Sequence, residues 1–406
     1  MYVKEQAPLH SKPMNPSDLL KGYDPSNLSI GVLGGHSALD CCHGAKKEGF
    51  RTVCVARKGR NTTYDTYYKT HDGKGCVDEI IVVDAFECVL RADTMKKLRS
   101  MNTIFIQNRY FWVYVSDYGR IENDFNIPIF GNRTYVKIEE RNQKPVVSGV
   151  EPYNQYHLLH DAGIRTPKIF KNAKEIDRPV IVKANEKERK YERAFFIAGN
   201  ASTYETEGSR LEKEGKVDAS WRNAVIEELI VGAPVNFNFF YSPLSGELEL
   251  MGTDTRRQTN LDGFLRLTAD EQTKALRSGI PLKMIETGHI AVTVKESLLE
   301  KAFELGEKFV AATLRLGADA PRSGQAPKMD GRGIIGPFAL QGAVIAEEGK
   351  EDIVIFDVSL RIPGSPGTKF TPYSMYLHGE PMSYGERIAQ EIRRAVNEER
   401  LEEIIT

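Results

Sequence analysis

The sequence predicts an α/β fold with a doubly wound parallel sheet at the N-terminus, followed by an α+β part that contains a long antiparallel hairpin. Residues 28–56 are patterned as strand, tight turn, helix and strand, which is how a parallel sheet begins. Residues 334–362 are patterned as two apolar strands joined by a charged turn near Gly349. The 406 residues are enough for two or three domains.

Composition and charge describe an ordinary globular protein. Apolar residues make up 41% of the chain, charged residues 27%, and the formal net charge is −1. Charges of both signs are mixed throughout, which argues against a nucleic-acid partner. No apolar run reaches the ~18 residues of a membrane span, and the N-terminal run MYVKEQAPLHSKPMNPSD lacks the apolar segment of a secretory signal. We therefore expect a cytoplasmic protein, and we expect it to form a homo-oligomer.

All cysteines lie in the first quarter of the chain. They are Cys41, Cys42, Cys54, Cys76 and Cys88. Without CxxC spacing or a histidine cluster beside them, they predict neither a zinc site nor a disulfide framework. We expect small core residues in a reducing compartment.

Polar side chains follow the predicted parallel strands. We expect strands at 28–33, 51–56, 79–83 and 103–107, and a helix at 38–48. The turn LGGHSALD lacks GxGxxG spacing, but its glycines let backbone N–H groups approach a phosphate monoester. His36 lies at the tip of this turn, and Arg57-Lys58-Gly59-Arg60 and Asn108-Arg109-Tyr110 follow other strands at the same edge. A solvated loop is the alternative interpretation of both His36 and the basic cluster.

The hairpin at 334–362 has an apolar and a polar face. Folding about Gly349 places Gln341 opposite Asp357 and Ala343 opposite Ile355. Period-2 alternation assigns one face to Val354, Phe356, Val358, Leu360 and Ile362, and the other to Asp357, Ser359 and Arg361. Oxygen ligands opposite one another, with an arginine four residues on, suit a hard cation such as Mg²⁺ beside a phosphate. A solvated polar face is the alternative.

Helical periodicity and loop composition complete the prediction. We expect helices at 296–316 and 385–398, loops at 142–154 and 319–333, and a surface-wrapping segment at 1–27.

Several runs resemble one enzyme family. In the N-terminal part these are GxHSAL at 34–39, EGFRTVxxxRKGR at 48–60 and FGNR at 130–133. Further on they are AGIRTP at 162–167, PVIVK at 179–183, IEELIVG at 226–232, FFYSPLSGELELMGTDTRRQTNLDG at 239–263, GPFALQ at 336–341 and IFDVSLR at 355–361. Together they resemble the archaeal-type formate-dependent 5-formaminoimidazole-4-carboxamide ribonucleotide (FAICAR) synthetases of purine biosynthesis. The resemblance covers residues 28–405.

The resemblance implies an ATP-grasp fold and a carbon–nitrogen ligase. It implies an N-terminal α/β domain at 1–150, a small ATP-grasp subdomain at 151–230, and a C-terminal ATP-grasp domain with the metal strands at 231–406. ATP and Mg²⁺ or Mn²⁺ are the implied cofactors. The implied substrates are formate, or a similar small acid, and aminoimidazole carboxamide ribonucleotide (AICAR) or a similar ribonucleotide, with formyl phosphate as the intermediate.

The resemblance also assigns roles to individual residues. Lys183 and Arg361 are catalytic, His36, Tyr110 and Asn260 bind the ribonucleotide, Glu227, Glu228 and Ile230 bind ATP together with Lys183, and Gln341 and Asp357 hold the metal. The alternative for Lys183 is a surface lysine at a strand end, and the alternative for Asn260 is a turn residue. Glu227 and Glu228 point to opposite sides of a strand, so at most one of them faces the nucleotide.

The chain departs from the family pattern at the active site. Where the family has a glycine-rich loop, Lys183 is followed by ANEKERKYERAFF, which either reaches the phosphates by side chain or forms a solvated helix. Tyr110 replaces a small hydroxyl residue, His289 and Lys369 each replace an asparagine, and Asp357 replaces a glutamate. Two alternatives therefore stay open: a diverged ligase for another small carboxylate or amine, and a non-catalytic nucleotide-binding paralogue.

Overall fold

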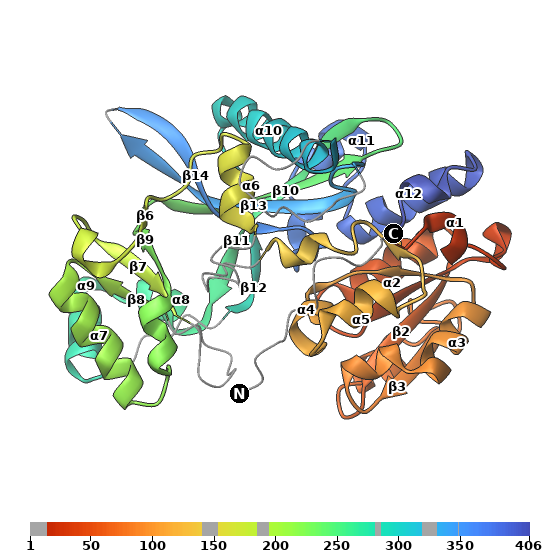
Figure 1. The fold of residues 1–406 in the computed structure, drawn as a ribbon, viewed down its shortest axis with the longest axis horizontal. Coiled ribbons are helices and arrows are strands. Elements are labelled where there is room, and N and C mark those ends of the chain that lie inside the picture. The colour runs from red at the N-terminus through yellow and green to blue at the C-terminus, as the bar shows by residue number, and fades with distance from the viewer. Residues whose placement is uncertain (1–13, 140–152, 185–194, 281–285, 319–330, 348) are drawn as a thin grey trace.

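The computed structural model describes residues 14–139, 153–184, 195–280, 286–318, 331–347 and 349–406. The strands of these residues form three sheets. Figure 1 shows a parallel sheet with its helices at one end of the molecule, a four-stranded sheet at the other end, and an antiparallel five-stranded sheet spanning the region between them. The predicted α/β class is confirmed.

The parallel sheet is the one predicted from the N-terminal strand pattern. Its strands are β1 (Ser29–Leu33), β2 (Arg51–Arg57), β3 (Glu79–Val83), β4 (Thr103–Ile106) and β5 (Ile129–Phe130), in the order β3-β2-β1-β4-β5. Its helices are α2 (Ala38–Lys47), α3 (Ala92–Ser100), α4 (Arg109–Tyr114) and α5 (Tyr118–Asn123). The strand order reverses between β1 and β4, and ligands of open α/β sheets bind at such a switch point. The turn after β1 and the start of α4 both lie there.

The four-stranded sheet has its own small core. Its strands are β6 (Ile169–Phe170), β7 (Val180–Lys183), β8 (Phe195–Ala198) and β9 (Val225–Glu228), in the order β6-β9-β7-β8. Helix α7 (Ala201–Lys213) packs on this sheet through Trp221, whose ring lies 5.0 Å from that of Tyr204 and 5.9 Å from that of Phe196. Glycine is required at Gly208 of α7 because a Cβ there would lie 2.3 Å from the Trp221 ring. The sheet thereby presents Lys183 at the end of β7.

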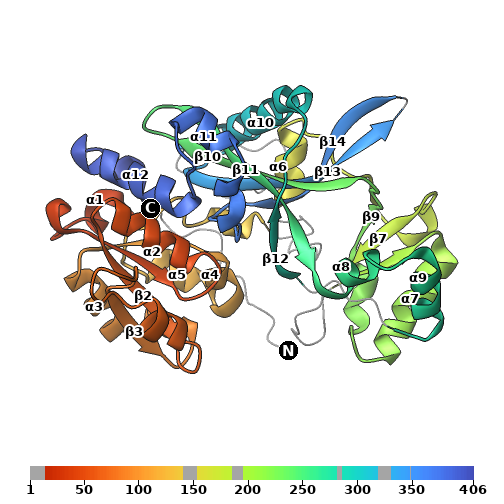
Figure 2. The same ribbon diagram turned by 180° about the vertical axis from the view of Figure 1, so that it is seen from behind.

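The antiparallel sheet forms the centre of the molecule. Its strands are β10 (Ala233–Ser242), β11 (Glu247–Gln258), β12 (Glu286–Ala291), β13 (Gly336–Glu347) and β14 (Lys350–Ser359), in the order β12-β11-β10-β13-β14. Helices α6 (Gln155–Asp161) and α10 (Leu299–Ala318) share one core with it, in which Phe338 stacks between Phe239 and Phe309. Seen from the front and from behind, β12 extends from this sheet toward the region between the other two sheets (Figures 1 and 2).

The hairpin of β13 and β14 confirms one predicted residue pair and corrects another. Gln341 lies opposite Asp357, as predicted. Ala343, however, does not lie opposite Ile355, because the register shifts by one residue after Gln341 and places Gly342 there.

This register shift is a β-bulge at Phe356, the residue of β14 without a partner in the ladder to β13. The alternation of side chains shifts with it. The residues of β14 that belong to the shared core are Ile353, Ile355 and Val358, followed by Leu360 just after the strand. The prediction that Val354 and Phe356 lie on one face with Val358 and Leu360 is therefore wrong, because simple alternation continues only where the ladder is regular.

Helix α12 (Tyr384–Asn397), predicted at 385–398, packs against α2 with the two backbones in contact. A Cβ on Gly44 would lie 2.1 Å from the backbone of Gly385, and a Cβ on Gly385 would lie 2.0 Å from the carbonyl oxygen of Asp40. The N–H of Gly385 donates to Asp40 Oδ2 at 2.9 Å. The Tyr384 hydroxyl reaches the carbonyl oxygen of Phe338 at 3.1 Å, so α12 links the parallel sheet to the antiparallel one.

The remaining helices are α1 (Pro16–Leu19), α8 (Thr259–Leu265), α9 (Ala269–Arg277) and α11 (Tyr373–His378). The helix predicted at 296–316 is a 3-10 turn, Glu296–Leu298, followed by α10. The predictions for residues 1–13, for the charged run after Lys183 and for most of the loops at 142–154 and 319–333 lie outside the described residues. Where the chain is described, none of its helices combines the length and apolarity needed to span a membrane.

Candidate active site

Three strands that are distant in the sequence meet at the side chain of Lys183. Its ammonium lies 2.6 Å from the carboxylate of Glu227 on β9 and donates to the carbonyl oxygen of Phe356 on β14 at 3.2 Å. The side chains of Lys183 and Glu227 are 6% and 1% exposed, so they form a buried ion pair. The hydroxyl of Tyr156 on α6 also donates to Glu227. The bulge at Phe356 leaves its carbonyl outside the regular ladder, where the lysine reaches it.

The two predicted metal ligands lie next to this junction. Asp357 follows Phe356 and is 8% exposed, and Gln341 lies opposite it on β13. The Gln341 side chain accepts a hydrogen bond from Arg256 Nη2 at 2.5 Å and donates one to Ser359 Oγ at 3.0 Å. The side chain of Arg256, which comes from β11 two strands away in the same sheet, therefore covers part of the polar face of the hairpin.

These two residues would offer a bound Mg²⁺ one protein carboxylate. Mg²⁺ is commonly held by one or two carboxylates together with phosphate oxygens of the substrate, and Asp357 supplies one. Gln341 would supply an amide oxygen after releasing Arg256, because a guanidinium donor and a cation compete for the same lone pairs. Across the described ranges, no three His, Cys, Asp or Glu side chains lie together as a metal site.

His36 and Tyr110 lie together at the switch point of the parallel sheet. Their rings are nearly parallel, with centroids 6.5 Å apart and an interplanar angle of 22°. Two glycines make room for them. A Cβ on Gly35 would lie 2.2 Å from the Tyr110 ring, and a Cβ on Gly364 would lie 2.4 Å from the His36 ring. The segment after β14, which contains Gly364, therefore closes onto the turn after β1.

The electrostatic surroundings keep His36 neutral. The His36 side chain is exposed, and partial desolvation by the surrounding protein, together with the positive charge of Arg361, lowers the pKa of its imidazole. A neutral imidazole has one donor and one acceptor nitrogen. It suits hydrogen bonds to a polar substrate better than charge neutralisation.

Glu139 ties the edge of the parallel sheet to the end of β14. Its Oε2 accepts a hydrogen bond from Arg109 Nη1 at 2.8 Å, and its Oε1 accepts one from the backbone N–H of Leu360 at 2.7 Å. The same Oε1 lies 3.4 Å from Arg361 Nε. Burial lowers the pKa of Arg361, and Glu139 opposes that effect. One buried carboxylate thus holds two guanidinium groups, an arrangement suited to binding phosphate.

A second charged cluster surrounds His289 on β12. His289 Nδ1 lies 2.8 Å from Asp254 Oδ2 and 3.1 Å from Ser365 Oγ, and Nε2 lies 3.3 Å from Glu286 Oε1. Burial alone would lower the pKa of His289, but the two carboxylates outweigh it and raise the pKa to about 9. His289, which replaces an asparagine of the resembled family, is therefore an imidazolium at neutral pH.

The other predicted residues lie around this centre. Glu228 is half-buried and pairs with Arg178 at 3.1 Å, whereas Glu227 pairs with Lys183. Ile230 is half-buried just after β9. Asn260 is exposed and lies in helix α8 rather than in a turn.

Several members of these clusters were not predicted from the sequence. They are Glu139, Tyr156, Asp254, Arg256 and Glu286. A signal existed for Asp254 and Arg256, because the alternation D-x-R on a strand places both side chains on one face. Glu139 gave no such signal, since its contact with Leu360 joins residues 221 positions apart.

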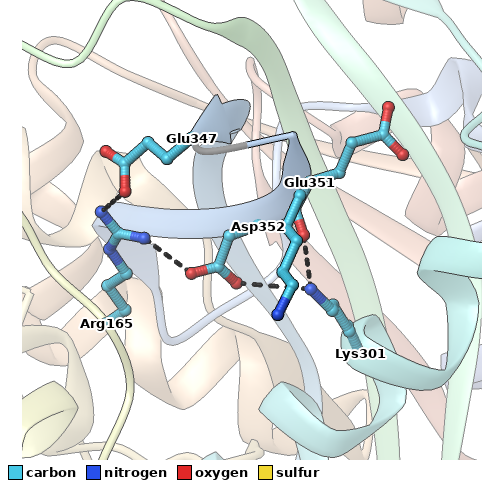
Figure 3. A pocket seen from close by; sticks show the side chains of 6 residues that line it. Arg165, Lys301, Glu347, Glu351 and Asp352 are labelled. Carbon is cyan, nitrogen blue, oxygen red and sulfur yellow. Dashed lines mark hydrogen bonds and ion pairs between the residues drawn. The ribbon is translucent and has the colours of Figure 1, made fainter.

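A surface hollow of about 690 Å³ lies at the outer end of the same hairpin, away from these clusters. It is lined by Arg165, Lys301, Glu347, Lys350, Glu351 and Asp352. Figure 3 shows Arg165 between Glu347 and Asp352, with nitrogen–oxygen distances of 2.8 and 2.7 Å. These are exposed ion pairs, and none of the predicted site residues lines the hollow.

Comparison with known proteins identifies the family. A family model described as a domain of unknown function (DUF1297) matches residues 203–406, and one described as a protein of unknown function (DUF1246) matches residues 30–170. The 5-formaminoimidazole-4-carboxamide-1-(beta)-D-ribofuranosyl 5'-monophosphate synthetase of Methanobrevibacter smithii is 34% identical over 96% of this chain and 97% of its own length.

Solved structures agree on the fold. The IMP biosynthesis protein PurP from Thermococcus kodakaraensis is 25% identical, with a TM-score of 0.64 over 93% of this chain and 100% of that one. The ADP complex of PurK, an N5-carboxyaminoimidazole ribonucleotide synthetase, is 11% identical, with a TM-score of 0.55 over 91% of this chain and 78% of that one, and it shares the ATP-grasp fold. The chain therefore belongs to the family of 5-formaminoimidazole-4-carboxamide-1-(beta)-D-ribofuranosyl 5'-monophosphate synthetases.

Proposed function

We propose that this protein is the ATP-dependent ligase that forms FAICAR from AICAR, formate and ATP. Family membership supports the reaction type, and one observation carries the proposal for this chain. The ammonium of Lys183 lies between Glu227 of the predicted adenine-binding strand and the carbonyl oxygen of Phe356, the residue before Asp357. A cation at this position can neutralise phosphate oxygens of a nucleotide that lies between β9 and β14.

Two bond exchanges make up the proposed reaction. A formate oxygen attacks the γ-phosphorus of ATP, and the bond from that phosphorus to ADP breaks, which gives formyl phosphate. The amine of AICAR then attacks the formyl carbon, phosphate leaves, and the nitrogen loses a proton. Both steps depend on placing reactants in contact and neutralising charge, which proteins achieve with fixed cations and dipoles.

On the nucleotide side, Lys183 and Arg361 would bind phosphate oxygens and Asp357 would hold Mg²⁺ or Mn²⁺, with Gln341 as a second ligand once Arg256 releases it. Bound there, the cation would neutralise charge that develops between the β- and γ-phosphates. Adenine would lie against the end of β9, which carries Glu227 and Glu228. The half-buried side chain of Ile230, just after this strand, would form its apolar contact surface.

On the acceptor side, His36 and Tyr110 would orient the ribonucleotide at the switch point of the parallel sheet, and Asn260 would contact it from α8. The neutral imidazole of His36 favours hydrogen bonding to ribose or carboxamide groups. Arg109, held by Glu139, is the cation at the same edge suited to the 5'-phosphate.

The decisive experiment supplies the purified protein with ATP, Mg²⁺, formate and AICAR and follows FAICAR and ADP by chromatography. We expect both products in equal amounts, and no FAICAR when any one component is omitted. Calorimetry should show Mg-ATP binding at millimolar concentration or tighter. ATP turnover only with another acid or amine would replace this assignment by a diverged ligase, and absent ATP binding would favour a non-catalytic paralogue.

The cellular location and the oligomeric state of the protein belong to the same proposal. The cysteines are free thiols, and four of the five are buried, which suits a reducing cytoplasm. We also propose a homo-oligomer, which sedimentation analysis of the purified protein would test.

A further inference from the structure

We propose that Arg256 and His289 form the subsite for the carboxylate of the acid substrate, and that the Glu286 carboxylate fills this subsite until the acid displaces it. The identification of the acid as formate rests on the proposed function, but the carboxylate chemistry of the subsite does not.

The two cations are direct neighbours across adjacent strands. Arg256 on β11 and His289 on β12 are register partners, which places their side chains on the same face of the sheet. The Glu286 carboxylate lies between them, with Oε2 3.2 Å from Arg256 Nε and Oε1 3.3 Å from His289 Nε2. One oxygen for each cation is the geometry by which any small carboxylate would bind at this place.

Glu286 is the replaceable member of this group. His289 is also held by Asp254 at 2.8 Å, and Arg256 also donates to Gln341 at 2.5 Å until a metal takes up that side chain, so neither cation depends on Glu286 alone for its position. The Glu286 side chain is 44% exposed, against 27% for Arg256 and 14% for His289. A partly solvated carboxylate between two fixed cations exchanges for another carboxylate with little change in local charge.

The strand geometry near Glu286 also departs from regularity. The register of β11 and β12 shifts between Arg257 and Gln258, and Gly288 adopts a φ of +152°, which other residues rarely take. Bulges of this kind re-aim side chains next to active sites. Here the shift lies between His289 and Glu286, the two residues that must face one another.

The subsite also lies where the acid has to react. Through Arg256 it touches Gln341, which lies opposite Asp357 on the strands assigned to the metal and the γ-phosphate. On the other side it is within electrostatic range of His36: besides burial and Arg361, the charges of Glu286 and His289 act on the pKa of that imidazole. A carboxylate here would be placed between ATP and the ribonucleotide, as the two bond exchanges require.

The test varies the internal carboxylate and one cation separately. Glu286→Gln should lower the KM for formate roughly two- to five-fold, which corresponds to the free energy of a partly exposed ion pair. The KM values for ATP and AICAR should stay within about two-fold of those of the wild type. His289→Asn should raise the KM for formate roughly ten-fold or more, because a charge-assisted hydrogen bond is lost. Glu351→Gln, the same charge change in the outer hollow, is the matched control and should change neither value.

A direct readout separates this proposal from the proposed function. Formate, and acetate as a second probe, are titrated into protein without ATP or AICAR while the imidazole resonances are recorded, with His289→Asn identifying the signal of His289. That signal should move, and at lower formate concentration in Glu286→Gln. A signal that stays fixed, or a formate KM that rises or is unchanged in Glu286→Gln, overturns the subsite. A protein that forms no FAICAR although the signal moves would instead overturn only the reaction.

Discussion

The ammonium of Lys183 and the carboxylate of Glu227 lie 2.6 Å apart, and almost no solvent reaches either group. A buried pair of this kind links activity and stability in a way that substitutions can separate. Lys183→Met should lower activity roughly 100-fold or more by removing the phosphate-binding cation. It should also lower the free energy of unfolding by roughly 3–5 kcal/mol, because Glu227 is left buried without its cation.

The double variant Lys183→Met with Glu227→Gln distinguishes the two effects. Removing both charges should restore most of the stability in chemical denaturation but none of the FAICAR formation. Recovery of activity in the double variant would show that Lys183 serves only to neutralise Glu227.

Asp357→Asn tests the metal strand. The side chain keeps its size and can still accept the hydrogen bond from the N–H of Val358, so the melting temperature should change little. Activity should fall roughly 100- to 1000-fold, and raising the concentration of Mg²⁺ or Mn²⁺ in the assay should restore little of it. Asp352→Asn, on the same strand but in the exposed pair with Arg165, is the control and should keep full activity. Equal losses in both variants would point to a structural role of the strand.

Tyr110→Ser tests whether the phenol ring narrows the ribonucleotide site. The ring lies on Gly35 and beside His36, and overpacking of a site typically amounts to about 1–3 kcal/mol. We expect the KM for AICAR to fall roughly five-fold or more in steady-state assays, with the KM for ATP unchanged. Tyr114→Ser removes a ring that packs on Tyr110, at a centroid distance of 4.9 Å, and should give no such gain. A loss of activity in Tyr110→Ser alone would mean that the ring supports His36 instead.

His289 predicts a pH dependence of stability with a defined sign. Its folded pKa of about 9 lies above the ordinary value of 6.5, so folding favours the protonated imidazole. The stabilisation is fully present below pH 6.5 and disappears as the pH rises through about 9, amounting to at most about 3 kcal/mol. The difference in melting temperature between the wild type and His289→Asn should therefore shrink between pH 6.5 and 10. A constant difference would contradict the charged state of His289.

The parallel sheet was predictable because its strands are apolar runs bounded by turns, and because a glycine, Gly49, follows the end of the helix after β1. The hairpin was predictable as a pair of strands but not in its full register. The bulged residue, Phe356, is neither glycine nor proline. The local signal is Gly342 on the facing strand, because a glycine inside a strand often marks a bulge, but it does not tell which residue of β14 is left without a partner. The consequence is substantial, since the bulged carbonyl is the one that receives Lys183.

The candidate site was predictable only in part, for a related reason. Lys183, Gln341 and Asp357 stand at strand positions that alternation and order along the chain can define. The partners that fix their geometry are remote in the sequence: Glu227, the partner of Lys183, lies on the neighbouring strand β9, and Arg256, the partner of Gln341, lies on β11, two strands away in the same sheet. Such tertiary contacts decide which polar residue is buried and paired, and strand periodicity carries no information about them.

The glycine contact between α2 and α12 has a consequence for recombining this protein with its relatives. A chimera that takes its first half from one parent and its second half from another brings Gly44 and Gly385 together from different sources. With 2.1 Å between a Cβ on Gly44 and the backbone of Gly385, even an alanine from one parent would force the two helices apart. Crossover libraries should therefore transmit these two positions as a linked pair, although 341 positions of sequence separate Gly44 from Gly385.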